Sequence, residues 1–171
     1  YIDADTLVLE HIQDIFNKNM SDHVIAACPS GTDWQFNLSL SPDKKYFNAG
    51  VCLINLDNWC SNDIGYKCIQ YIIENEPALN DQAALNQVCH GLSGVKMLSP
   101  QYNVHGKWMK RFQESNHEPK IVHYNGPRKP WIKNVNRRYK ETYHGYFNET
   151  DLDSSLKYTQ TNPKTITNKL I

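Results

Sequence analysis

The chain has 171 residues with 18 acidic and 18 basic side chains, a length that allows one domain with a buried core. Hydrophobic residues make up 40% and aromatic residues 11%, which is typical of a globular protein and excludes an intrinsically disordered one. No apolar run approaches the roughly 18 residues of a membrane-spanning helix, and no basic segment followed by an apolar stretch indicates a secretory signal.

Two aspartates separated by one residue, Asp3 and Asp5, open the chain. On an extended backbone, side chains at i and i+2 leave the same face, about 6.6 Å apart along the strand. Two carboxylates held in this way repel each other unless a cation lies between them, which favours a divalent metal with an anionic ligand behind it. An ordinary pair of aspartates in a loop is the alternative. Tyr1 and Ile2 resemble the end of a buried strand, so we expect the chain to be the later part of a longer protein.

The spacing of apolar residues predicts alternating helices and strands along the chain. The predicted helices cover residues 6–17, 64–73, 81–90 and 131–143, and the predicted strands cover residues 23–27, 51–56, 95–98 and 120–123. We expect an exposed loop over 31–46, a single domain over 1–146, and a polar tail or appendage over 147–171. This alternation predicts a predominantly parallel α/β sheet, with ligands at the carboxyl ends of strands.

The segment K-I-V-H-Y-N-G-P-R-K-P-W at 120–131 is the second informative stretch. Imidazole is a good ligand for Mn²⁺ or Zn²⁺, so His123 could complete a site begun by the two aspartates. Gly126 would let the backbone approach a phosphate, and Lys129 would add a positive charge. A core histidine in a turn braced by prolines is the alternative.

Two further groups could contact a ligand. Small residues around Ala49 and Gly50, next to Asn48, suggest a backbone that another group approaches, although a plain turn before a strand would look the same. Asp81 and Gln82 begin a predicted helix, where they could form a cap or hydrogen-bond the hydroxyl groups of a sugar.

Four motifs together resemble glycosyltransferase family 8, a retaining group that uses nucleotide sugars. In order, they are Y-I-D-A-D-T, Y-F-N-A-G-V-C-L-I-N-L, N-D-Q-A-A-L-N and H-Y-N-G-P-R-K-P-W, within about residues 1–132. The resemblance implies an α/β fold of the GT-A type, Rossmann-like, without the N-terminal nucleotide-binding strands. Pro29 and Ser30 depart from the family, which often carries an acid there, so recognition of the donor hydroxyls is expected to differ.

The resemblance also implies a set of ligands. Mn²⁺ or Mg²⁺ would be held by Asp3, Asp5 and His123 against the diphosphate of a UDP-sugar. The other residues expected at the donor and its cofactor are Ala4, Asn48, Ala49, Gly50, Gly126 and Lys129. Asp81 and Gln82 match the pair beside the sugar ring and are the catalytic candidates. The acceptor is expected to be a glycan or a lipid-linked molecule, and the transferred hexose glucose or galactose.

Two other functions fit parts of the sequence. D-x-D-x-T is also the start of haloacid dehalogenase-type phosphatases, in which the first aspartate attacks phosphorus. Such a site needs a later acidic pair after another strand, whereas Asp151 and Asp153 lie in the polar tail. The second alternative is a non-catalytic relative that binds sugar nucleotides.

Charge and cysteine content bear on partners and location. Residues 1–106 carry 5 Lys or Arg against 12 Asp or Glu, whereas residues 107–140 carry 10 against 2. This asymmetry favours an anionic partner, such as a membrane surface, although a solvated basic helix face is an equal explanation. No nucleic acid is expected, and the oligomeric state stays open. Five cysteines without a C-x-x-C pair predict mostly reduced, buried thiols in a reducing compartment, so we expect a cytoplasmic location. The basic segment 107–140 suggests peripheral contact with the inner face of the membrane.

Overall fold

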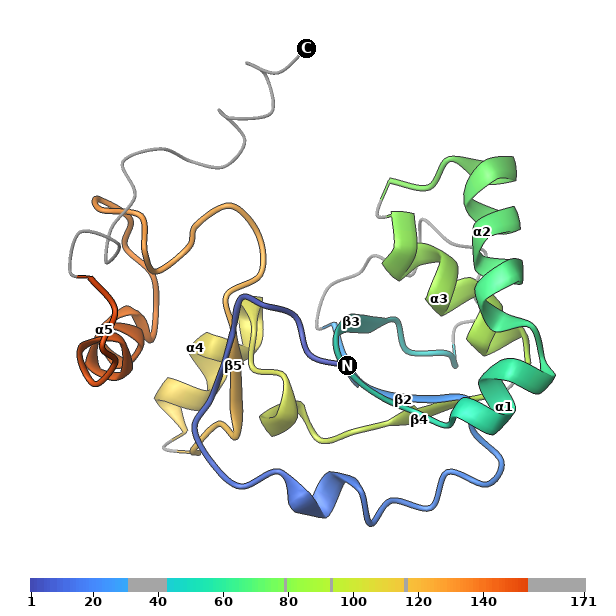
Figure 1. Ribbon diagram of the computed structural model, residues 1–171, viewed down its shortest axis with the longest axis horizontal. Helices are drawn as coiled ribbons and strands as arrows, with labels where there is room; N and C mark the ends of the chain where they lie inside the picture. Colours follow the sequence, from blue (N-terminus) through green and yellow to red (C-terminus); the bar gives the residue numbers. More distant parts are fainter. Residues whose placement is uncertain (31–42, 79, 93, 116, 154–171) are drawn as a thin grey trace.

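A computed structural model describes residues 1–30, 43–78, 80–92, 94–115 and 117–153 (Figure 1). A three-stranded sheet has the order β3 (Phe47–Ile54), β2 (Ile25–Pro29) and β4 (Val95–Met97). A two-stranded sheet joins β1 (Thr6–Val8) to β5 (Ile121–His123). Ile2, just before β1, forms an isolated antiparallel bridge to Val51 of β3. The start of the chain therefore lies against the three-stranded sheet.

The prediction of a predominantly parallel sheet is wrong. β2 pairs antiparallel with β3, and β1 pairs antiparallel with β5; β2 and β4 form the parallel pair. Parallel strands need a crossover connection, usually helical. That condition is met between β2 and β4, because three helices lie between them in the chain: α1 (Leu56–Ser61), α2 (Ile64–Asn75) and α3 (Asn80–Gly91).

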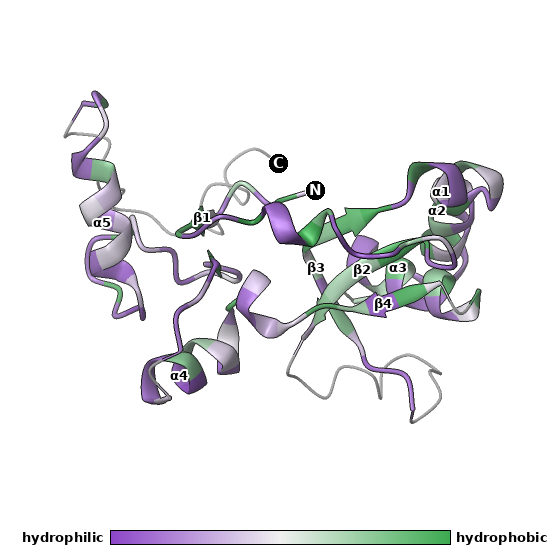
Figure 2. Ribbon diagram, turned by 90° about the horizontal axis from the view of Figure 1, so that it is seen from below, coloured by the Kyte–Doolittle hydropathy of each residue, from purple (hydrophilic) through white to green (hydrophobic). Residues whose placement is uncertain are grey.

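These helices cover one face of the three-stranded sheet (Figure 1). Ile64 and Cys68 lie four residues apart on α2 and are buried, so one side of the helix packs against Phe47 and Cys52 of β3. Complete burial of a side chain such as Ile64 contributes about 1.5–3 kcal/mol. The hydrophobic colouring in Figure 2 is concentrated in β2 and β3, the strands against which the helices pack. The predicted helix over 64–73 is therefore confirmed.

A second cluster forms around the two-stranded sheet. Val104, Met109, Val122 and Tyr124 are buried there, between β5 and α4 (Gly106–Glu114). The helix α5 (Lys140–Asn148) adds Tyr143, whose ring meets Tyr124 edge-on. Short 3₁₀ helices, η1 (Gln13–Ile15) and η3 (Pro100–Tyr102), connect the two clusters.

Two predicted helices are wrong. Residues 6–17 contain β1 and η1, because Leu7 and Val8 pair with β5 at the far end of the sequence. Residues 131–139 contain turns, and the helix begins only at Lys140, after Tyr139 with φ +58°. The predicted strands near 23–27, 51–56, 95–98 and 120–123 and the helix near 81–90 are present with shifted ends. The sequence did not predict α1 or α4. The expected loop at 31–46 and the expected tail lie largely outside the described residues.

All five cysteines are free, and four of them are buried, as expected; Cys60 is exposed. Burial raises the pKa of the Cys68 thiol to about 11, which makes it a poor nucleophile. Within the described part of the chain, no helix combines the length and apolar character needed to cross a bilayer.

Candidate metal and sugar-nucleotide site

Asp3, Asp5 and His123 converge, and ligand atoms from the three side chains lie within 4.8 Å of one another. The pairing of β1 with β5 sets His123 opposite Thr6, one residue beyond Asp5. The Asp3 amide donates to the Gly50 carbonyl at 2.8 Å, which anchors the first aspartate to β3. His123 Nε2 lies 3.4 Å from Asp3 Oδ2 and 3.2 Å from Asp5 Oδ1.

Hydrogen bonds on the Nδ1 side of His123 indicate which ring nitrogen carries the proton and which is free to act as a metal ligand. Asn103 Nδ2 donates to Asn48 Oδ1 at 2.8 Å, which turns Asn103 Oδ1 toward His123 Nδ1 at 3.0 Å. An amide oxygen only accepts, so Nδ1 carries the proton and Nε2 is left to face Asp3 and Asp5. A lone pair and two carboxylates that face one point repel one another, and a cation between them relieves that repulsion. Two carboxylates and an imidazole suit Mn²⁺, so the side chains present fit the expected ion.

Lys129 places a positive charge next to Asp5. Its Nζ contacts Asp5 Oδ2 and donates to the Tyr124 carbonyl at 2.9 Å. Contact with His123, and then with Lys129, outweighs burial and holds the pKa of the Asp5 carboxyl well below its usual range. Gly126, in the loop between them, has φ +78° and open space where a side chain would start. A ligand therefore has room to approach its backbone, and the expected contact with a phosphate stays a prediction.

His123 and Asp3 pack so closely on Gly50 that a side chain there would overlap both. A Cβ atom at this position would sit 2.2 Å from His123 Cε1 and 2.8 Å from Asp3 Oδ2. The backbone of β3 is thus approached by the proposed metal ligands themselves. Asn48, Ala49 and Gly50 lie inside β3, which starts at Phe47, and not in a turn before it.

A chain of hydrogen bonds links His123 to Gln82. Beyond Asn103, Asn48 Nδ2 donates to Gln82 Oε1 at 2.9 Å, and the Ala49 amide donates to the same oxygen at 3.1 Å. Gln82 Nε2 in turn donates to the Tyr46 hydroxyl at 3.2 Å. The Gln82 side chain is therefore fixed by three contacts to the segment that begins β3.

Asp81 lies in the first turn of α3, where its Oδ1 accepts from the Gln82 amide at 2.8 Å. A cavity of about 300 Å³ is lined by several of the predicted donor-site residues. Its lining includes Asp3, Ala49, Gly50, Asp81 and Gln82. Ala4 is exposed between the two aspartates and does not line this cavity.

Three residues at the site were missed by sequence reasoning. Asn103 ends η3, and its surroundings in the sequence, S-P-Q-Y-N-V, give no signal of a role at the site. Tyr1 donates its hydroxyl to Asp3 Oδ1 at 2.6 Å, and this bond to a carboxylate raises the pKa of Tyr1 to about 12. His105 is 2% exposed, with its ring centroid 5.9 Å from that of His123.

Replacing Asn103 with leucine is expected to weaken Mn²⁺ binding about 10–100-fold, because residues that orient a metal-bound histidine have effects of that size. The change removes the acceptor for His123 Nδ1 and the donor to Asn48. Titration with Mn²⁺ followed by calorimetry measures the effect. Asn17→Leu, at an exposed position after η1, is the matched control. Equal affinities in parent and Asn103→Leu would show that the asparagine does not orient the ring.

Because His105 is buried, we expect the stability of the protein to fall in acid. Burial, reinforced by the nearby His123 and Arg137, lowers the pKa of His105 to about 3, against about 6.5 in an unfolded chain. Between these values the unfolded chain binds a proton that the folded chain does not, so the free energy of unfolding falls as pH falls below about 6.5. Around pH 5 the loss is about 2 kcal/mol. Urea unfolding at pH 7 and pH 5 tests this: His105→Gln should reduce the difference, and the exposed-site control His11→Gln should keep it.

The sequence profile described as glycosyl transferase family 8 matches residues 1–135. The chain therefore belongs to this family, which confirms the resemblance seen in its motifs. It is 27% identical to general stress protein A of Bacillus subtilis (strain 168), over 88% of this chain and 58% of that protein. It is 28% identical to the lipopolysaccharide 1,3-galactosyltransferase of Salmonella typhimurium (strain LT2), over 77% of this chain and 43% of that enzyme.

Among solved structures, the fold matches the galactosyltransferase LgtC in complex with donor and acceptor sugar analogs. The TM-score is 0.76, with 22% identity over 91% of this chain and 62% of that one. This likeness confirms the GT-A type of α/β fold. The chain thus spans roughly half of the length of the two curated relatives.

Proposed function

We propose that this chain supplies the metal- and sugar-binding part of a retaining glycosyltransferase that moves a hexose from a UDP-sugar to a glycan or lipid-linked acceptor. The observation that carries the proposal is the convergence of Asp3, Asp5 and His123, with Lys129 beside them. The names of the relatives support glucose or galactose as the sugar and a lipopolysaccharide-type acceptor. A cytoplasmic location with peripheral membrane contact stays a prediction.

Breaking a bond between a sugar and a diphosphate leaves negative charge on the departing group. Mn²⁺ held by the two aspartates and His123 would neutralise part of that charge. Lys129 adds a second positive charge, and its bonds to Asp5 and the Tyr124 carbonyl fix the direction of its ammonium group. Gly126 offers an open backbone to the same diphosphate.

Gln82 is better suited to hold the sugar than to attack it. Its amide oxygen has no full charge, and its two lone pairs already accept from Asn48 and Ala49. We therefore infer that the acceptor attacks from the face that the diphosphate leaves, with the diphosphate taking the acceptor's proton. In this account Gln82, with Asp81 beside it, positions the sugar ring.

Gln82→Ala is expected to lower kcat about 100-fold, because misplacing a reacting group by about 1 Å costs that much. The measurement is the transfer rate of the complete protein at saturating donor. Gln70→Ala, in the α2 helix away from the site, serves as the control. A Gln82→Ala protein that turns over at the parent rate would remove this residue from the site.

A panel of UDP-sugars offered to the complete protein with Mn²⁺ tests the proposed function. We expect slow hydrolysis of one UDP-hexose that stops on addition of a chelator. Hydrolysis of a generic phosphomonoester with Mg²⁺ would instead indicate the phosphatase, which the family match does not support. Donor binding without any hydrolysis or transfer would identify a non-catalytic relative.

A further inference from the structure

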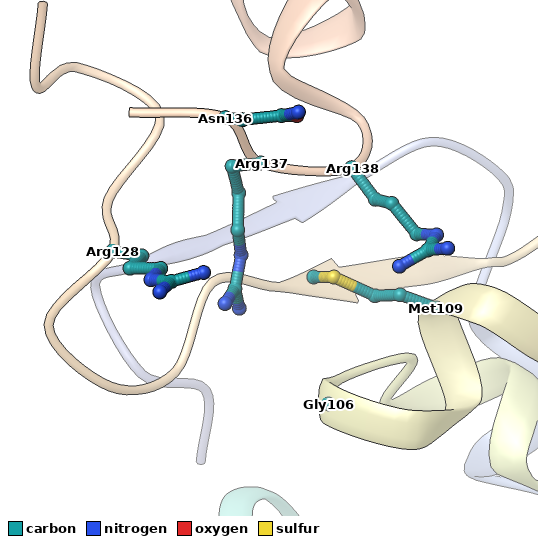
Figure 3. Close-up of a pocket in the computed structure, with 6 residues that line it drawn as sticks. All are labelled: Gly106, Met109, Arg128, Asn136, Arg137 and Arg138. Carbon is teal, nitrogen blue, oxygen red and sulfur yellow. The ribbon is translucent and has the colours of Figure 1, made fainter. Parts of the chain in front are cut away.

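A second cavity, of about 420 Å³, lies beside the loop that carries Gly126 and Lys129. We call it the arginine pocket; its lining residues are Gly106, Met109, Arg128, Asn136, Arg137 and Arg138 (Figure 3). Figure 3 shows Arg128 and Arg137 converging from two loop segments, and Arg138 reaching down toward Met109 on α4. No acidic side chain is among the lining residues.

None of the carboxylates that the structure describes pairs directly with the three guanidinium groups of the arginine pocket. Because these groups line one cavity, they repel one another. Burial is the main cause of the lowered pKa of Arg137; Tyr124 and Asp5 raise it in part, and the charge of Arg128 lowers it further. Such a gathering of like charge is unfavourable unless an anion offsets it.

Arg137 is only partly satisfied by the protein. Its Nη2 donates to the Asn125 carbonyl at 3.1 Å, whereas its Nε is buried and has no hydrogen-bond partner among the described residues. Leaving a buried donor unpaired costs about 1–3 kcal/mol. A buried donor that the described residues leave unpaired is available to a ligand in the pocket that Arg137 lines.

Guanidinium groups present paired N–H donors that match phosphate oxygens, which makes phosphate the best ligand for this pocket. It is separate from the proposed site of the donor diphosphate: Asp3, Asp5, His123 and Lys129 are not among its lining residues. The two sites are nevertheless neighbours. Arg137 holds Asn125, next to Gly126, and His105, before Gly106 of the pocket, packs against His123.

We propose that the arginine pocket binds a phosphoryl group carried by the acceptor. This inference rests on the proposed function and deepens it, because it makes the acceptor a phosphorylated sugar. A phosphate seated there would place the rest of the acceptor along the Gly126 loop, toward the transferred sugar. The pocket would thereby select acceptors by charge, independently of the donor.

Binding of glucose 6-phosphate, followed by calorimetry on the complete protein with saturating Mn²⁺ and UDP, tests the pocket. We expect glucose 6-phosphate to bind and glucose not to bind. Arg138→Gln and Arg128→Gln, both at exposed positions, should weaken binding at least tenfold, and Arg137→Lys should do so while keeping the charge. Lys67→Gln, on the exposed side of α2, is the control and should bind like the parent.

Three results would overturn the proposal. One is binding of glucose 6-phosphate only when UDP is left out of the titration, which would assign the pocket to the donor diphosphate. Another is unchanged binding in all three arginine variants. The third is arginine-dependent binding to phosphatidylcholine vesicles containing phosphatidic acid, with no binding of the sugar phosphate, which would assign the phosphate to a lipid headgroup. UDP-sugar hydrolysis by the parent protein is measured separately, so a failure of the proposed function is recognised without reference to the pocket.

Discussion

Asp5→Asn is expected to lower the kcat of the Mn²⁺-dependent reaction by roughly 10³-fold, because a metal ion supplies several kcal/mol of charge stabilisation. The substitution keeps the shape of the side chain and removes its charge. It therefore takes away one metal ligand and also the anion that Lys129 contacts. The rate of donor turnover, measured across a range of Mn²⁺ concentrations, gives the loss directly.

A second readout separates metal binding from catalysis. A ligand that binds only the folded state raises thermal stability in proportion to the logarithm of its concentration over Kd. Added Mn²⁺ should raise the Tm of the parent and of the surface control Asp22→Asn, and leave that of Asp5→Asn nearly unchanged. If Mn²⁺ raised the Tm of all three proteins equally, Asp5 would not be a metal ligand.

Gly50→Ala is the second large effect that we expect. The added methyl group would overlap the His123 ring and press on Asp3, so the ring must leave its position between the two aspartates. Mn²⁺ binding should fall at least 100-fold, a size known for losses of ligand orientation. Overpacking should also lower the free energy of unfolding by about 1–3 kcal/mol. Calorimetric titration with Mn²⁺ and urea unfolding measure the two effects.

Gly91→Ala is the matched control for this change. Gly91 ends α3, with nothing within 4 Å of an added Cβ atom, so the methyl group there meets only open space. Because alanine favours helix more than glycine does, stability should stay level or rise by up to about 1 kcal/mol. Gly50→Ala protein with parent-like Mn²⁺ affinity would contradict the close approach of β3 to His123.

The sequence predicted local structure where the pattern was local. Ile64, Cys68 and Ile72 repeat at helical spacing and pack on the core, so residues 64–73 were assigned correctly, although Ile69 and Ile73, expected on the same face, are exposed. Residues 6–17 were misassigned because β1 exists through its partner β5, more than 100 positions later. The helix expected over 131–143 failed for a similar reason: the segment around Arg137 is held by a hydrogen bond to Asn125.

The site shows the same division. Asp3, Asp5 and His123 stand in short motifs whose residue types indicate a metal, and the structure brings them together. Asn103 could not have been predicted, because its role depends on the positions of His123 and Asn48 in space. The arginine pocket was also out of reach. The sequence shows the basic composition of 107–140, but not which three side chains would share a cavity.

The hydrogen-bond chain from His123 through Asn103 and Asn48 to Gln82 has a thermodynamic consequence. An ion that fixes the imidazole also fixes the amide at the far end, and so lowers the entropy still to be lost when a hexose docks there. Such coupling acts equally in both directions. We therefore expect cooperative binding, in which sugar nucleotide tightens the hold on manganese by the same factor as manganese tightens the hold on sugar nucleotide.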